Sequence, residues 1–134
     1  MNPARRVHPP SSPGGGSIPG MADCLFCRIV AGEIPATIAH ETPSALVFHD
    51  IAPKAPVHLL AIPKEHHEVA ASVAGADPKL AGEVLAAATE AAAKAGLTGG
   101  YRLIANTGPD SGMEVAHFHV HVLGGRPLGP MLAD

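Results

Sequence analysis

The clearest periodic pattern in the chain is helical and covers residues 78–95. Apolar residues recur there at i, i+3 and i+4 spacing, which places them on one face of an α-helix. Asp77 can cap the N-terminus, Pro78 fits the first helical position, and Gly96 follows the end. Because the apolar residues are mostly small, this helix can approach a sheet closely and cover one face. The predicted stripe consists of Leu80, Val84, Ala87, Ala88, Ala91 and Ala95.

Five other apolar runs are typical of strands, and prolines and glycines mark the turns between them. A further short run, Cys24–Val30, is followed by Gly32 and predicts a short helix. Because a single connection is long enough for a helical crossover, the expected fold is α+β, with a five-stranded antiparallel sheet, one long helix and one short helix. The predicted strands are Thr37–Glu41, Ala45–His49, Val57–Ile62, Tyr101–Ala105 and His117–Leu123.

The last of these strands alternates histidine with apolar residues. Successive side chains of a strand point to opposite faces, so the histidines share one face and the apolar residues pack under the long helix. Neutral imidazole is a good nucleophile near pH 7, which suits phosphoryl or nucleotidyl transfer. Metal binding is the competing chemistry, and the alternation alone does not decide between them. The histidines are His117, His119 and His121, and the apolar residues are Phe118, Val120 and Val122.

Composition narrows the class of protein. The chain has 134 residues, 46% of them hydrophobic, and a formal net charge of −3 with nine lysines and arginines, which argues against nucleic-acid binding. The apolar runs are too short to span a membrane and the N-terminus lacks a secretory pattern, so we expect a cytoplasmic protein. Residues 1–20 are rich in proline, glycine and serine and predict a disordered extension, and residues 21–134 predict one folded domain.

The two cysteines, Cys24 and Cys27, form a C-x-x-C pair. In a chain without export signals such a pair is a redox dithiol or half of a metal site. The residues before the pair do not form the βαβ pattern of a thioredoxin-like dithiol, which favours the metal site.

Several sequence blocks resemble one known family. The alternating strand has the form His-φ-His-φ-His-φ-φ, where φ is apolar, and the sequence resembles the histidine triad (HIT) superfamily, most closely its Hint branch of nucleoside phosphoramidases. The likeness covers nearly all of residues 22–131. The other matching blocks are D-C-L-F-C-R-I-V-A-G-E-I-P-A at 23–36, F-H-D-I-A-P-K-A-P-V-H at 48–58, I-P-K-E-H at 62–66 and G-G-R-P-L-G-P-M at 124–131.

The resemblance implies a homodimer in which two sheets join into ten strands, and it assigns catalytic roles by position. His119 would attack the α-phosphorus of a purine nucleotide substrate and form a nucleotidyl-imidazole intermediate, which water cleaves. His121 would contact the phosphate and help the amine leave, and His58 would orient the nucleophilic ring. His117, the first histidine of the triad, completes the catalytic set. His121 also favours a phosphoramidase over a dinucleoside polyphosphate hydrolase; a nucleotide-binding adaptor is a further alternative.

The resemblance also implies a nucleotide-binding set: an apolar slot for the purine, Asp50 at the ribose, and a loop at the phosphate. Two positions depart from the pattern of relatives. Met113 stands where many have glutamine, and Glu114 stands where some have serine, so we expect the backbone amide of Glu114 to make that contact. The implied residues are Leu25, Phe26, Ile29, Phe48, His49, Asp50, Ile51, Leu60, Asn106, Gly112, Glu114 and Val115.

Finally, some bacterial relatives with this pattern bind zinc. The resemblance implies that Cys24 and Cys27 share a structural Zn²⁺ with His66 and His117, with His67 as the alternative to His66. Two cysteines and two histidines make a closed tetrahedral site without an open position for catalysis. No catalytic cofactor is expected.

Overall fold

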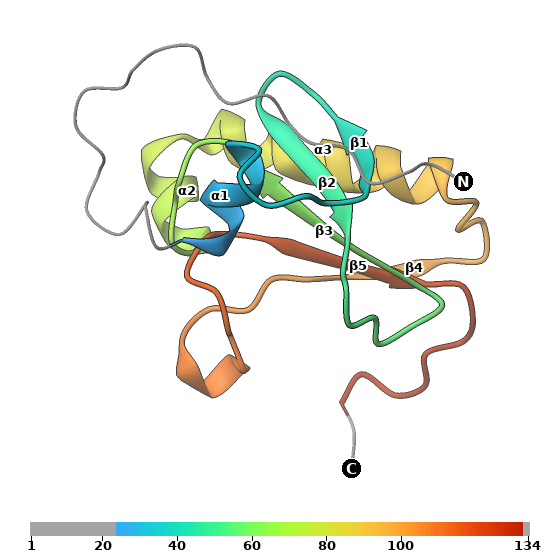
Figure 1. The fold of residues 1–134 in the computed structure, drawn as a ribbon. Helices are drawn as coiled ribbons and strands as arrows, with labels where there is room; N and C mark the ends of the chain where they lie inside the picture. The colour runs from blue at the N-terminus through green and yellow to red at the C-terminus, as the bar shows by residue number, and fades with distance from the viewer. Residues whose placement is uncertain (1–23, 133–134) are drawn as a thin grey trace.

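A computed structural model describes residues 24–132 as one α+β domain (Figure 1). The predicted disordered extension, residues 1–20, lies outside the described residues. Within them, the expected fold class is confirmed. The elements in chain order are α1 (Leu25–Val30), β1 (Ile38–Glu41), β2 (Ala45–His49), β3 (Val57–Pro63), α2 (Ala70–Ala76), α3 (Pro78–Lys94), β4 (Tyr101–Ile104), a 3₁₀ turn (Pro109–Ser111) and β5 (Val120–Gly124).

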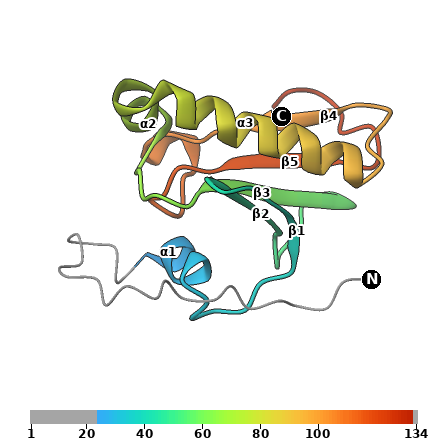
Figure 2. The same ribbon diagram turned by 90° about the horizontal axis from the view of Figure 1, so that it is seen from above.

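The five strands form one antiparallel sheet in the order β1-β2-β3-β5-β4. Helix α3 lies across one face of the sheet and α1 lies on the opposite face (Figure 2). The β3–β5 pair brings His58 and His121 close together, although they are distant in sequence. The register sets His58 opposite Leu123 and His121 opposite Leu60, so the two histidines are diagonal neighbours on one face of the sheet.

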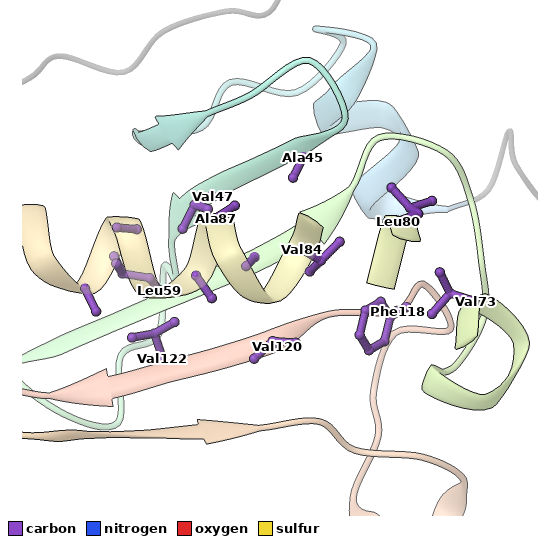
Figure 3. Close-up of a cluster of buried hydrophobic side chains, with 14 of the residues drawn as sticks. Ala45, Val47, Leu59, Val73, Leu80, Val84, Ala87, Phe118, Val120 and Val122 are labelled. Carbon is purple, nitrogen blue, oxygen red and sulfur yellow. The ribbon is translucent and has the colours of Figure 1, made fainter. Parts of the chain in front are cut away.

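The face under α3 is closed by aliphatic side chains and one phenylalanine (Figure 3). The predicted stripe of α3 is buried from Leu80 to Ala91, but the prediction for Ala95 is wrong, since Ala95 caps the helix and is exposed. The chain leaves the helix through a Schellman motif, with Gly96 at φ +77° and Leu97 N–H donating to the carbonyl of Ala92. Ala92 therefore takes the last buried position of the helix.

Two features of the structure differ from the predicted elements. Helix α2 was not expected, because its seven residues bury only Val73 and so carry no apolar stripe. The hydrogen-bonded ladder of β5 starts at Val120 rather than at His117, because Phe118 donates its N–H to the carbonyl of His67 instead. The alternation persists through this segment, since Phe118, Val120 and Val122 all belong to the core under α3.

The face under α1 holds a smaller apolar cluster, in which Phe26 and Ile29 of α1 pack against Phe48 and Leu60 of the sheet. This cluster is adjacent to the histidines and the cysteines. None of the described helices is long and apolar enough to cross a membrane.

Candidate active site

A cavity of about 460 Å³ opens on the α1 side of the sheet. Its walls come from α1, the ends of β2 and β3, the loop before β5, and β5 itself. Three histidines of the predicted catalytic set, His58, His119 and His121, line it. So do all twelve residues that the sequence places at the nucleotide: Leu25, Phe26, Ile29, Phe48, His49, Asp50, Ile51, Leu60, Asn106, Gly112, Glu114 and Val115.

Five further lining residues were missed from the sequence: Ile34, Pro35, Ala36, Ala52 and Lys54. All five fall inside the two sequence blocks at 23–36 and 48–58. Each block supplies a continuous stretch of wall, so treating the blocks as whole segments rather than as single contacts would have found them.

The apolar part of the cavity suits a flat aromatic group. Phe26 and Phe48 meet edge to face, with ring centroids 5.6 Å apart, and Leu60 lies beside them in the same cluster. Ile51 lines the cavity yet is fully exposed, which places it at the mouth. A planar ring entering this slot would displace water from the apolar side chains that line it.

Two of the histidines form a directed hydrogen-bond chain. The backbone N–H of Lys54 donates to Nδ1 of His58 at 3.0 Å, so the proton of the neutral His58 ring is on Nε2. That Nε2 lies 2.9 Å from Nδ1 of His121 and 3.5 Å from a carboxylate oxygen of Asp50. His121 therefore accepts at Nδ1 and carries its own proton on Nε2.

The tautomer of His119 is fixed by the main chain. Its Nδ1 lies 2.7 Å from the carbonyl oxygen of His117, and a carbonyl can only accept, so Nδ1 carries the proton. In the neutral ring Nε2 then keeps an unshared electron pair. The expectation that His58 orients this ring is wrong: His58 bonds to His121, and the His117 carbonyl orients His119.

Burial keeps the surrounding imidazoles uncharged. Desolvation, followed by the nearby His119 and His58, lowers the pKa of His121 to about 4, against a weaker opposite effect of Asp50. Desolvation also lowers the pKa of His58 from its ordinary value. Near pH 7 both rings are therefore neutral, as the hydrogen-bond chain requires.

His117 lies apart from the cavity. Its side chain is fully buried and turned to the cysteines, so the structure supports its assignment as a metal ligand and does not place its ring in the cavity with His58, His119 and His121. His117 Nδ1 lies 3.3 Å from Cys24 Sγ, 3.5 Å from Cys27 Sγ and 3.2 Å from His66 Nδ1. His67 instead pairs with Glu65 at 3.0 Å, so His66 is the histidine that joins the cluster.

The metal cluster, defined as Cys24, Cys27, His66 and His117, fits a tetrahedral ion. Zinc bonds of the usual length would separate the four ligand atoms by roughly 3.4–3.8 Å. Four of the six separations in the structure are 3.2–3.5 Å, and all six lie within 4.8 Å. His117 Nε2 donates to the Pro63 carbonyl at 2.9 Å, which leaves the Nδ1 electron pair facing the cluster. Burial and then the Cys24 thiol raise the pKa of Cys27 to about 12. A bound cation would lower that pKa again, because it stabilises the thiolate.

A second group of potential ligands, Asp50, His58 and His121, does not pass the same test. His58 already accepts the Lys54 N–H at Nδ1. Coordination through Nε2 would require the ring to lose its remaining proton, which is far less favourable than binding through a neutral imidazole. These three residues are better described as a hydrogen-bonded proton network in the cavity.

Comparison with known proteins identifies the family. The HIT domain family model matches residues 31–128, and the chain belongs to that family. It is similar to an uncharacterized HIT-like protein of Synechococcus elongatus, with 44% identity over 106 residues that cover 79% of this chain and 93% of the relative.

Solved structures of the family show the same fold. A HIT family hydrolase from Clostridium thermocellum superposes with a TM-score of 0.79 at 38% identity, covering 83% of this chain and 97% of that one. A histidine triad nucleotide-binding protein from Candida albicans superposes with a TM-score of 0.69 at 27% identity, covering 83% and 85%.

Proposed function

We propose that the protein is a purine nucleoside phosphoramidase that hydrolyses the P–N bond through a covalent intermediate on His119. The observation that carries the proposal is the tautomer of His119. With Nδ1–H held by the His117 carbonyl, the nitrogen at the opposite edge of the ring, Nε2, is free to attack in a residue that lines the cavity. The similarity to a hydrolase and to a nucleotide-binding protein of the same family supports this class of reaction.

The first step forms a bond between Nε2 of His119 and the α-phosphorus, while the P–N bond breaks and the nitrogen leaves as an amine after taking up a proton from solvent. The modified ring is positively charged and still donates its Nδ1–H to the His117 carbonyl, which stabilises that charge. In the second step water attacks phosphorus and releases a proton to solvent, the P–Nε2 bond breaks, and the neutral ring is restored.

The remaining cavity residues bind and orient the substrate. The purine would occupy the slot between Phe26 and Phe48, and Asp50 would accept the ribose hydroxyls. His121, with its proton on Nε2, can donate to a phosphate oxygen, and His58 holds it in that tautomer. Backbone amides of the loop from Gly112 to Val115 would bind the phosphate, where the side chains of Met113 and Glu114 are poorly suited to do so.

Three further features belong to the proposal. The metal cluster would hold a structural Zn²⁺, as its donor set and spacing support. The protein would act in the cytoplasm as a homodimer. The dimer is supported by β4, an edge strand of the described sheet on which Tyr101, Leu103 and Ile104 are each more than a third exposed.

The experiment is intact-mass spectrometry after brief mixing with an adenosine phosphoramidate. We expect a mass increase of one nucleotidyl group, mapped to His119, and a loss of on the order of 10³-fold in rate for His119→Ala. His40→Ala is a matched control, because His40 bonds to Glu90 and Lys94 and does not line the cavity. A His119→Ala variant that keeps most of its activity would overturn the assignment, and faster turnover of a dinucleoside polyphosphate would change the substrate class.

A further inference from the structure

His117 connects the metal cluster to His119, a residue that lines the cavity. The side chain of His117 belongs to the metal cluster, anchored by its Nε2 on the Pro63 carbonyl. The main-chain carbonyl of the same residue accepts the Nδ1–H of His119, two residues further along. One residue therefore connects a coordinating ring on one side to the tautomer of the nucleophilic ring on the other.

Phe26 forms a second connection between the two sites. It lies between Cys24 and Cys27 in the chain and is buried. Its ring meets His117 at 5.8 Å and His119 at 5.1 Å between centroids, both edge to face, and it also lines the cavity. A shift of the cysteines would move Phe26 against the nucleophile and the apolar slot together.

The connection through Phe26 depends on how the N-terminus of the short helix α1 is held. Helix α1 has six residues and is capped by Cys24 itself, whose Sγ accepts the Cys27 N–H at 3.4 Å. A helix of this length has little stability of its own, and neutral thiols make weak hydrogen bonds. Four metal–ligand bonds would replace these weak contacts and fix α1 to the sheet.

We propose that occupancy of the metal cluster by a divalent cation controls the nucleotide site, with His117 as the positioning residue that transmits it. In the loaded protein the His117 carbonyl holds His119 in the Nδ1–H form and Phe26 completes the purine slot. In the metal-free protein both are released. The effect on turnover rests on the proposed function, whereas the effects on the His119 tautomer and on nucleotide affinity do not.

Linkage makes the proposal reciprocal. If the cation raises the affinity for a nucleotide, the nucleotide must raise the affinity for the cation by the same factor, and couplings of this kind are typically about 5–150-fold. The cation and the nucleotide need not touch the same residue for this coupling, because it acts through His117 and Phe26.

The test uses the full chain, stripped of metal by a chelator and then titrated with Zn²⁺. Nitrogen-15 NMR of the histidine rings should show His119 as a mixture of tautomers without Zn²⁺ and as the Nδ1–H form with it. AMP affinity, measured by calorimetry, should rise about 5–150-fold with Zn²⁺, and Zn²⁺ affinity, measured against a competing chelator, should rise by the same factor with AMP.

Neighbouring histidines provide the matched variants. His66→Gln should abolish the effect of Zn²⁺ on the His119 tautomer and on AMP affinity. His66→Cys, which keeps four ligands, should retain both effects. His67→Gln should leave both effects intact, because its ring pairs with Glu65 outside the cluster.

An unchanged His119 tautomer and equal AMP affinities with and without Zn²⁺ would overturn the proposal even in a protein with full phosphoramidase activity. Loss of the far-UV circular dichroism on chelation would also overturn it, since the metal would then hold the whole domain. Intact coupling without phosphoramidase activity would refute only the proposed function.

Discussion

The two faces of the sheet are built on different principles. The face under α3 is closed by a continuous aliphatic layer whose members, such as Leu59 and Val84, are fully buried. The face under α1 has a short helix, a cavity, and buried histidines such as His117 and His119. Because the first face stabilises the domain largely by apolar burial, the second can keep open space and polar groups. In this protein stability and chemistry are therefore assigned to opposite sides of the same strands.

Adjacent residues of β3 offer the most direct way to break this comparison. Leu59 points to the α3 face and is fully buried, and Leu60 points to the cavity and is 6% exposed. We expect Leu59→Ala to lower the free energy of unfolding by about 2–5 kcal/mol, measured by urea denaturation, with little change in AMP affinity. Leu60→Ala should weaken AMP binding about 5–30-fold, the loss expected for about 1–2 kcal/mol of apolar contact. Equal effects of both variants on AMP affinity would contradict the division between faces.

The hydrogen-bond chain of the cavity predicts an effect on turnover. Removing the imidazole in His58→Ala frees His121 to change tautomer, since Nε2 of His58 is its donor at 2.9 Å. We expect turnover of an adenosine phosphoramidate to fall about 10–100-fold, the usual cost of losing a supporting hydrogen bond behind a functional group. The melting temperature of His58→Ala, and the turnover of His40→Ala, serve as controls. A His58→Ala variant with wild-type turnover would show that the chain has no role in the reaction.

The low pKa of His121 gives the stability of the domain a pH dependence of known sign. In the unfolded chain a histidine binds a proton below about pH 6.5, whereas in the fold His121 does so only near pH 4. Between these values the unfolded state binds more protons, so stability should decrease as the pH falls from 6.5 toward 4 and should stop decreasing from this source below 4. Urea denaturation of the zinc-loaded protein and of His121→Asn across this range checks it, and equal slopes would contradict it.

The sequence predicted most of the fold because each main element carries its own periodicity. The stripe of α3 and the alternation around Phe118 and Val120 are local patterns, and they survive in the structure. Helix α2 buries too little apolar surface to leave such a pattern. The start of β5 could not be predicted either, because it depends on a hydrogen bond from Phe118 to His67, which is distant in sequence.

The candidate site divides in the same way. Which residues would line the cavity could be inferred from sequence blocks of the family. How they are connected could not, because the partner of His58 is set by the register of β3 against β5 and the partner of His119 by the path of the main chain at His117. A list of residues does not show which nitrogen of each histidine ring carries the proton, and the chemistry of imidazoles depends on that choice.

The smallest predicted effect concerns the end of α3, where the sequence placed the last buried residue incorrectly. Ala92 is fully buried, whereas Ala95 is an exposed cap residue. A hydroxyl at position 92 must be desolvated, so we expect Ala92→Ser to cost about 1–3 kcal/mol in urea denaturation. Ala95→Ser should remain within about 0.5 kcal/mol of the wild type, as usual for an exposed position. Neither change should alter AMP affinity, because both positions lie on the side of the sheet that the cavity does not use. A change in AMP affinity from either variant would show that α3 reaches the site through the sheet, and the two faces would then have to be treated as one coupled unit.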